Sequence, residues 1–214
     1  MPIPAQHSPV VRTTARERVF KALQEWIIDG TLLPEERLND AELAKYFSVS
    51  RTPVREALQM LVEQKLVTMV PSSGTFVAPI DLHDMAHVYE LLGILQADAI
   101  DLGLKNITED DLARLREINQ EFYHCAERGE ARNALHADWA FHNRIAELSG
   151  NPYLVSYTEQ LMVQAHRNEI RFFETHAHFK QSYTSHEQII AALADRDAER
   201  AKQIIRDNWQ ISME

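Results

Sequence analysis

The chain has 214 residues and a formal net charge of −10 at pH 7, with 45% hydrophobic and 25% charged residues. This composition is typical of a globular protein with one large domain or two small ones, and it excludes fibrous and largely disordered classes. No apolar run approaches the roughly 18 residues that span a bilayer, and the first residues lack the pattern of a signal peptide. We therefore expect a cytoplasmic protein with no membrane partner. The single cysteine, Cys125, excludes an internal disulfide framework.

Charge is distributed unevenly along the chain. Residues 1–80 carry nine Lys or Arg and nine Asp or Glu, whereas residues 81–214 carry the other 13 basic and 23 acidic residues. Nine of the ten histidines also follow residue 80. A neutral segment joined to an acidic, histidine-rich one predicts two domains with different partners.

The N-terminal segment begins with residues 1–11, which hold three prolines and few large apolar side chains. We expect them to form a flexible arm. From Thr14, apolar residues recur at helical spacing as far as Gly30. Two further helices are predicted, one capped by Asn39 or Asp40 and the next by Ser50, because these residue types can cap a helix N-terminus.

β-branched residues over 66–70 and 75–78 flank a glycine-containing turn, a pattern that predicts a β-hairpin. Three short helices followed by a hairpin form a winged helix-turn-helix, which we assign to residues 12–78. A linker is expected at residues 79–83, because Pro79 fits neither a helix interior nor a central strand.

The remaining segment, residues 84–214, has helical periodicity throughout and no alternating strand pattern. Six helices with short connections predict an antiparallel bundle, so the whole chain is expected to be mainly α. The predicted helices cover residues 84–104, 109–128, 131–149, 152–175, 182–194 and 197–211.

The start of the third predicted helix carries candidate DNA-contacting residues. Arg51 and Arg55 are four positions apart and therefore share a face, with Ser50 and Thr52 at the helix start and Pro53 in its first turn. An arginine can bind guanine bidentately, and hydroxyl groups can bind phosphate. The alternative is a solvated helix face. The preceding helix, the tight turn and the wing favour DNA.

Three stretches in this region closely resemble the DNA-binding domain of GntR-family transcriptional regulators: residues 38–44, 49–58 and 74–77. The resemblance covers residues 14–78. It implies that Arg51, Thr52 and Arg55 contact operator DNA and that Gly74 lets the wing approach the minor groove. Ala41 departs from relatives that carry a DNA-contacting arginine in this helix.

A second candidate site lies in the predicted bundle. Asp138 and His142 are spaced i, i+4 on one helix and can converge on one point. A carboxylate and an imidazole at this spacing can hold a divalent metal such as zinc. The alternative is a hydrogen-bonded or solvated pair without a metal.

The residues around this pair resemble the FCD effector domain of the FadR subfamily of GntR regulators. They are Asp138, Phe141 and His142, residues 149–152, and residues 185–193 followed by Asp197 and Ala201. The resemblance implies a metal held by one Asp and three His, which correspond here to Asp138, His142, His186 and Asn208. Asn208 replaces the expected fourth imidazole, and an amide oxygen binds zinc more weakly.

The effector-binding positions also depart from the subfamily. Relatives usually carry an Arg and, four residues later, a Glu where this chain has Leu92 and Gln96. Arg167 and Arg171 are candidate replacements for holding an effector carboxylate, and a solvated helix face is the alternative. The other histidines between residues 124 and 178 have no motif context, and we interpret them as ordinary polar or core residues.

Together these features predict a ligand-responsive transcriptional regulator, with repression as the expected mode. Residues 84–214 would bind a small-molecule effector and dimerise, because a two-fold dimer reads paired half-sites in operator DNA. The alternatives are a metal-dependent hydrolase-like enzyme and a helical adaptor without DNA binding. The absence of a phosphate loop or nucleophile motif disfavours an enzyme.

Overall fold

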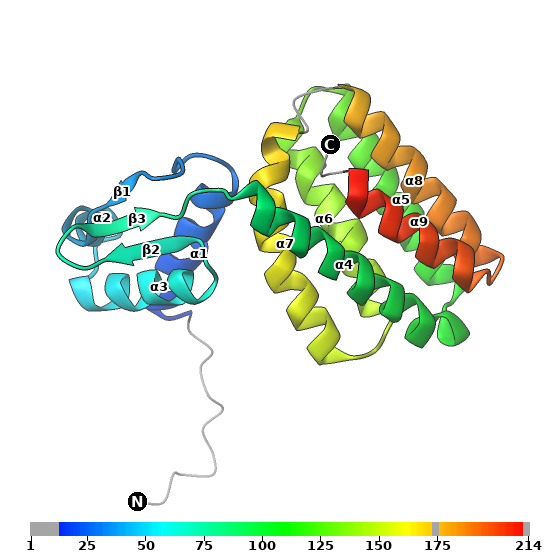
Figure 1. Cartoon of the computed structure of the whole chain (residues 1–214), viewed down its shortest axis with the longest axis horizontal. Helices are drawn as coiled ribbons and strands as arrows, with labels where there is room; N and C mark the ends of the chain where they lie inside the picture. The colour runs from blue at the N-terminus through cyan, green and yellow to red at the C-terminus, as the bar shows by residue number, and fades with distance from the viewer. Residues whose placement is uncertain (1–12, 173–175, 212–214) are drawn as a thin grey trace, which may run out of the picture. The chain divides into compact units, whose positions relative to one another are not determined.

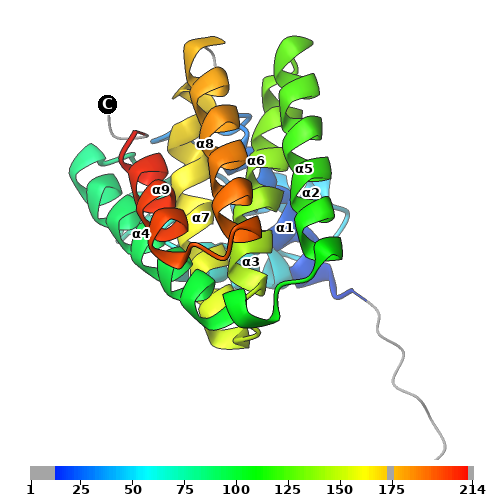
Figure 2. The same cartoon turned by 90° about the vertical axis from the view of Figure 1, so that its right-hand side faces the viewer.

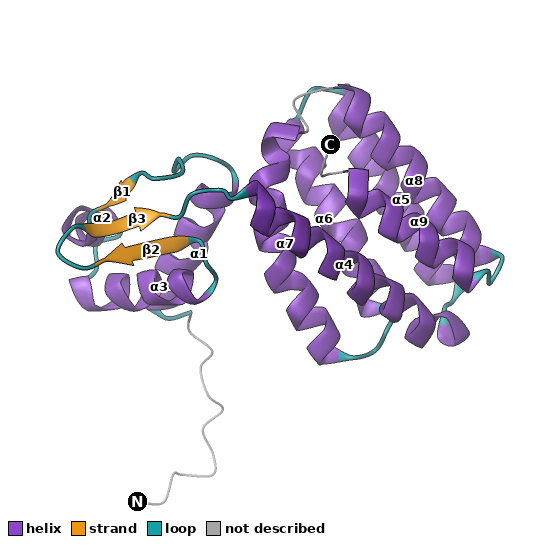
Figure 3. Ribbon diagram, viewed as in Figure 1, coloured by secondary structure: helices purple, strands orange, loops and turns teal. Residues whose placement is uncertain are grey.

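The structure, a computed structural model, describes residues 13–172 and 176–211, with the backbone alone for residues 170–172, 176–178 and 211. The arm predicted at residues 1–11 lies outside the described residues. The described residues divide into two compact units, one holding residues 13–27 and 33–78, the other holding residues 28–32, 79–172 and 176–211. Helices dominate both units, as Figure 3 shows. The predicted mainly α fold is confirmed.

The first unit contains three helices and a small sheet. Its elements are α1 (Ala15–Ile28), β1 (Arg37–Leu38), α2 (Asp40–Tyr46), α3 (Arg51–Glu63), β2 (Val67–Val70) and β3 (Gly74–Val77). The strands are antiparallel in the order β1-β3-β2 (Figure 1). Strand β1 escaped the sequence prediction because two residues carry no alternation pattern.

Local capping and apolar periodicity explain the helices of this unit. The side chain of Asn39 caps α2 by accepting a hydrogen bond from the backbone N–H of Ala41 at 2.9 Å. Ser50 occupies the N-cap position of α3, but its side chain makes no capping hydrogen bond. Val54 and Leu58 are buried on the inner face of α3. The hydroxyl of Ser50 is therefore not committed to the helix backbone.

The second unit is a helical bundle. Its elements are α4 (Leu82–Gly103), the short 3-10 helix η1 (Leu104–Asn106), α5 (Glu109–Glu127), α6 (Ala131–Glu147), α7 (Pro152–Phe172), α8 (His176–Ala194) and α9 (Ala198–Ile211). Helix α4 packs along α9, and α5 packs against α6 and α8 (Figure 2). None of the described helices is long and apolar enough to cross a bilayer.

Two helices begin earlier than predicted. Asp81 caps α4 by accepting a hydrogen bond from the backbone N–H of His83 at 2.9 Å, so the helix starts at Leu82. Helix α8 starts at His176 rather than at residue 182. Phe179 in its first turns is buried and packs against Phe122, with ring centroids 5.7 Å apart. A contact with a distant helix thus stabilises a segment whose own sequence is largely polar.

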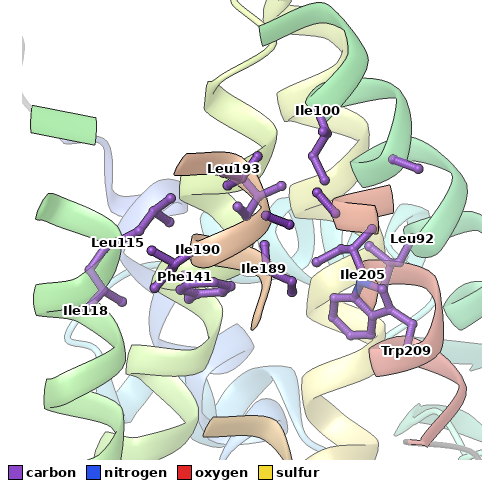
Figure 4. Packing of buried hydrophobic residues seen from close by; sticks show 14 of the residues in the cluster. Leu92, Ile100, Leu115, Ile118, Phe141, Ile189, Ile190, Leu193, Ile205 and Trp209 are labelled. Carbon is purple, nitrogen blue, oxygen red and sulfur yellow. The ribbon is translucent and has the colours of Figure 1, made fainter. Parts of the chain in front are cut away.

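The bundle core is apolar at its centre, and ten polar residues among those described are also buried. Leu92, Leu115, Phe141 and Trp209 are almost completely buried (Figure 4). The buried polar residues are Gln96, Asn119, Asp138, His142, Thr158, His166, Arg167, Glu169, His186 and Asn208. Burying polar groups costs free energy unless they are paired or bind a ligand. This concentration makes the bundle interior a candidate binding site.

Candidate functional site

The start of α3 presents Arg51 and Arg55, and both contact Asp40 at the start of α2. Arg51 Nη2 lies 2.7 and 2.9 Å from the two carboxylate oxygens, and Arg55 Nε lies 2.6 Å from Oδ2. Hydrogen bonds from the two arginines lower the pKa of Asp40. The arginine side chains remain 55% and 63% exposed. Asp40 therefore orients both guanidinium groups without covering them.

The other predicted DNA-contacting residues lie beside these arginines or on the wing. Ser50 and Thr52 are exposed, and Pro53 is half-buried in the first turn of α3. Gly74 begins β3 with φ +140°, and a Cβ there would lie 3.2 Å from Nε of Arg37. Glycine is thus favoured both by the backbone conformation and by the close side chain.

A cleft of about 490 Å³ separates the wing from α2 and α3. Its lining includes Asn39, Asp40, Arg55, Gln59, Gly74 and Thr75. Arg55 of α3 and Gly74 of the wing therefore border one concave surface, as expected for residues that contact a single DNA duplex.

In the bundle, Asp138 and His142 of α6 meet His186 of α8. His142 Nε2 lies 3.8 Å from Asp138 Oδ2, and His186 Nε2 lies 3.5 Å from Asp138 Oδ1. All three residues are at most 3% exposed. The structure thus brings three of the four predicted metal ligands to one point, although α6 and α8 are far apart in sequence.

Gln96 of α4 determines which nitrogen of His142 carries the proton. The indole N–H of Trp209 can only donate, and it lies 2.8 Å from Gln96 Oε1, while Gln96 Nε2 donates to the carbonyl of His142. The same Oε1 lies 3.0 Å from His142 Nδ1. His142 therefore donates from Nδ1, and its lone pair is on Nε2, which lies 3.8 Å from Asp138 Oδ2.

Asn119 of α5 imposes the same protonation on His186. Asn119 Nδ2 donates to Glu187 Oε1 at 2.6 Å, so its Oδ1 is the acceptor that lies 2.9 Å from His186 Nδ1. His186 Nε2 has no hydrogen-bond partner among the described residues. This nitrogen carries the lone pair of the ring and lies 3.5 Å from Asp138 Oδ1, so it can bind a metal ion beside that carboxyl group.

The electrostatics keep both imidazoles neutral. Burial lowers the pKa of His186 to about 3. Burial, followed by the neighbouring His186, lowers the pKa of His142 well below its usual value. Zinc binds neutral imidazoles and carboxylates, and such histidines typically donate their second ring nitrogen to a protein acceptor. Asp138, His142 and His186 therefore fit a divalent metal.

The fourth predicted position, Asn208 of α9, also lies in this site. Its Nδ2 is 3.3 Å from His142 Nε2, and the residue is 7% exposed. In this orientation the amide hydrogen-bonds the imidazole. Rotation of the amide would be needed to present its oxygen to a metal.

Of the two predicted effector-binding arginines, the structure describes the side chain of Arg167 alone. Arg167 is only 5% exposed, and burial lowers its pKa to about 10. The alternative of a solvated helix face is therefore wrong for Arg167. The side chain of Arg171 lies outside the described residues. Effector binding by either residue stays a prediction.

Sequence reasoning missed four polar residues of the site. Gln96 and Asn119 orient the histidines, while His166 and Glu169 of α7 lie near Asp138 and can join it as metal ligands. The i, i+3 spacing of His166 and Glu169 was the one available signal, and it is too common in solvated helices to single them out. Asn119 carries no recognisable pattern, and Gln96 drew notice only as a departure from the glutamate usual in relatives, not as a residue that orients a ligand.

Two known protein families match this chain, one in each of the two units. The profile of bacterial regulatory proteins of the gntR family matches residues 15–77, and that of the FCD domain matches residues 87–210. The chain belongs to the GntR family. This GntR regulator is 34% identical over 168 residues to the Nta operon transcriptional regulator of Aminobacter aminovorans, an alignment that covers 76% of each chain.

Two other relatives cover more of the GntR regulator. The transcriptional repressor NanR of Salmonella newport is 27% identical over 228 residues, covering 92% of this chain and 84% of NanR. The solved structure of Escherichia coli McbR/YncC has a TM-score of 0.82 and 25% identity, covering 94% of this chain and 95% of that chain. The protein is therefore a DNA-binding transcriptional regulator with an FCD domain, rather than an enzyme or an adaptor that lacks DNA binding.

Proposed function

We propose that this GntR regulator is a homodimeric repressor that binds a small anionic metabolite at a divalent metal in its bundle and thereby changes its affinity for operator DNA. One observation carries the proposal: the ligand atoms of Asp138, His142 and His186 all lie within 4.8 Å of one another inside the FCD domain, and all three residues are buried. Repression is supported by similarity to proteins such as the repressor NanR. A regulator of bacterial DNA acts in the cytoplasm, where we place this one.

Operator recognition is assigned to the exposed start of α3 and to the wing. To bind guanine edges, Arg51 and Arg55 would break some or all of their hydrogen bonds to Asp40. Arg55 contacts Asp40 through Nε, so its terminal nitrogens can bind a base while that hydrogen bond remains. Ser50 and Thr52, with Pro53 setting the helix start, would bind phosphate oxygens. Gly74 would allow the wing backbone to approach the minor groove.

The metal would be held by Asp138, His142 and His186, with Asn208 as a weaker fourth ligand. Zinc is the first candidate, because the set contains two imidazoles. A bound divalent ion would supply positive charge and open coordination positions for an anionic effector. Gln96 and Asn119 would keep the two imidazole rings in the orientation that binding requires.

A carboxylate is the proposed effector chemistry. Arg167 of α7 supports this choice, because a buried guanidinium binds carboxylates through strong, directional hydrogen bonds. Arg171, one turn further along α7, is the second candidate. An effector can alter DNA affinity only through different affinities for the two conformations of the regulator, typically about 1–3 kcal/mol.

Dimerisation is proposed through the bundle. Helix α4 exposes Leu91 and Ile94 by 42% and 44%, and Ile94 borders a groove of about 470 Å³ that also includes Gly93 and Arg206. Apolar side chains grouped on one face commonly mark a protein interface. Burial of such a patch would offset the repulsion between two acidic bundles.

The experiment starts by selecting operator fragments from a random DNA pool with the full-length protein. Fluorescence anisotropy then measures the affinity of the selected DNA without metal, with Zn²⁺, and with Zn²⁺ plus each member of a panel of small carboxylic acids. We expect one class of acid to change the affinity about 5- to 150-fold only when Zn²⁺ is present. An equal response of wild type and His186→Ala, with and without Zn²⁺, would disprove a metal-dependent effector site.

A further inference from the structure

Asp138 lies between two groups of metal-binding side chains. On one side are His142 and His186. On the other side are His166 and Glu169 of α7, whose ligand atoms and a carboxylate oxygen of Asp138 all lie within 4.8 Å of one another. Each group of three is completely buried. The second group contains neither histidine of the first.

His166 is an unusual buried histidine. It is 0% exposed, and within the described part of the chain neither ring nitrogen has a hydrogen-bond partner. Its Nε2 lies 3.9 Å from Glu169 Oε2, which is too far for a hydrogen bond. Its ring packs edge-on against Trp139, with centroids 4.5 Å apart. A buried imidazole without a hydrogen bond costs free energy that a bound ion would recover.

The charges around His166 also favour a cation. Glu169 is 2% exposed, and after burial its negative charge is the main cause that raises the pKa of Asp138. Burial, followed by His142 and His136, lowers the pKa of His166 to about 3, so the ring does not supply a positive charge at neutral pH. Asp138 and Glu169 thus place two buried carboxyl groups beside the imidazole of His166, and oxygen ligands of this kind bind divalent cations.

We propose that Asp138, His166 and Glu169 hold a second divalent cation in the bundle, with Asp138 bridging it to the cation held by His142 and His186. This proposal extends the metal centre of the proposed function, but the ligands from α7 belong to the second ion alone. A carboxylate that bridges two ions typically holds them about 3.5–4 Å apart. The second ion would tie α7, which also carries Arg167, to α6.

The ligand chemistry of the two sites differs. The first offers one carboxylate and two imidazoles, whereas the second offers two carboxylates and one imidazole. Oxygen-rich sites suit Mn²⁺ better than imidazole-rich sites do. Mn²⁺ is therefore the probe for the second site, and Zn²⁺ is the reference for the first.

The test counts metal ions in the full-length protein after chelation, reloading with Mn²⁺ or Zn²⁺ and removal of excess metal. Mass spectrometry of the metal content compares wild type with Glu169→Gln, His166→Ala and His186→Ala. The matched control is His124→Ala, which removes an exposed histidine from α5. We expect two Mn²⁺ per chain in wild type and control, and one in each of the three variants.

The outcomes separate the two proposals. If His186→Ala loses an ion while Glu169→Gln and His166→Ala keep the wild-type count, the second site is wrong and the proposed function survives. If Glu169→Gln and His166→Ala lose the only ion present while His186→Ala retains it, the second site stands and the first is wrong. A wild type without any bound Mn²⁺ or Zn²⁺ overturns both.

A second measurement needs no variant. Two Mn²⁺ ions bridged by one carboxylate are magnetically coupled, so the electron paramagnetic resonance spectrum of the loaded wild type should show the broadened multiline pattern of a pair. A spectrum of isolated Mn²⁺ at every loading up to saturation would overturn the bridged site, even if a variant fails to fold.

Discussion

Gln96 Oε1 lies 3.0 Å from Nδ1 of His142, although the two residues belong to different helices. In the sequence, Gln96 stood out only as a departure from the glutamate usual in relatives. The structure gives it a defined role, because its amide accepts from Trp209 and donates to the carbonyl of His142. Gln96 thus fixes the protonation and the orientation of His142, a candidate metal ligand.

Replacing Gln96 should therefore weaken metal binding. In Gln96→Leu, His142 loses the acceptor for its Nδ1 proton, and we expect the Zn²⁺ affinity to fall about 10- to 100-fold. Isothermal titration calorimetry of the chelated protein measures the change. Gln203→Ala on the exposed face of α9 is the control and should bind Zn²⁺ as wild type does. Equal affinity in both variants would show that Gln96 does not orient a ligand.

Asn208→His should strengthen zinc retention. The substituted side chain lies 3.3 Å from Nε2 of His142, and an imidazole there completes a set of one Asp and three His. We expect more zinc per chain in Asn208→His than in wild type, and less in His142→Ala, when the metal content is measured after identical purification. Equal, sub-stoichiometric metal in all three proteins would mean that these residues form no metal site.

Arg51→Ala should reduce operator affinity by about 1–3 kcal/mol and relax discrimination at one base position, because a bidentate contact with guanine is lost. Fluorescence anisotropy at fixed salt measures the change. The control is Arg114→Ala, which removes the same charge from an exposed position on α5. If the two variants bind the selected operator equally well, Arg51 does not read a base.

Acid should destabilise the metal-free bundle. The folded-state pKa values of His142, His166 and His186 lie below the ordinary value of 6.5. Below about pH 6.5 the unfolded chain binds protons that the folded chain excludes, so each histidine lowers the free energy of unfolding by up to about 1.4 kcal/mol per pH unit. Asp138 changes the free energy of unfolding in the opposite direction, because its raised pKa makes the folded chain bind a proton more readily than the unfolded chain does as the pH falls.

Urea denaturation in the presence of a chelator tests this pH dependence between pH 7.5 and 5. Wild type should lose stability steadily below about pH 6.5, and His186→Gln should show a slope shallower by up to about 1.4 kcal/mol per pH unit. An identical slope in both proteins would contradict the assignment of a neutral, buried His186.

Sedimentation should show a particle of twice the 24.6 kDa chain mass at micromolar concentration. Ile94→Arg should shift the equilibrium toward the monomer, because it places a charge in the exposed apolar patch of α4. Leu102→Arg, which changes another exposed apolar residue on the same helix, is the matched control. A wild type that sediments only as a monomer would exclude the proposed dimer.

The sequence by itself determined the features that depend on local periodicity and capping. The winged helix-turn-helix follows from helix caps such as Asn39, from the apolar stripe of α3 and from the glycine of the wing turn. The pairing of Asp138 with His142 follows from their i, i+4 spacing on one helix. Such signals act over a few residues, so they can be read without knowing the packing.

Only the tertiary structure decided which distant groups meet. His166 reaches Asp138 because α7 packs against α6, and His186 reaches it because α8 and α6 both pack against α5. Asp40 meets Arg55 because α2 packs against α3. These contacts depend on the crossing angles and relative shifts of helices, which packing of the whole core determines. The protonation of His142 and His186 depends in turn on those contacts, and no local pattern in the sequence encodes it.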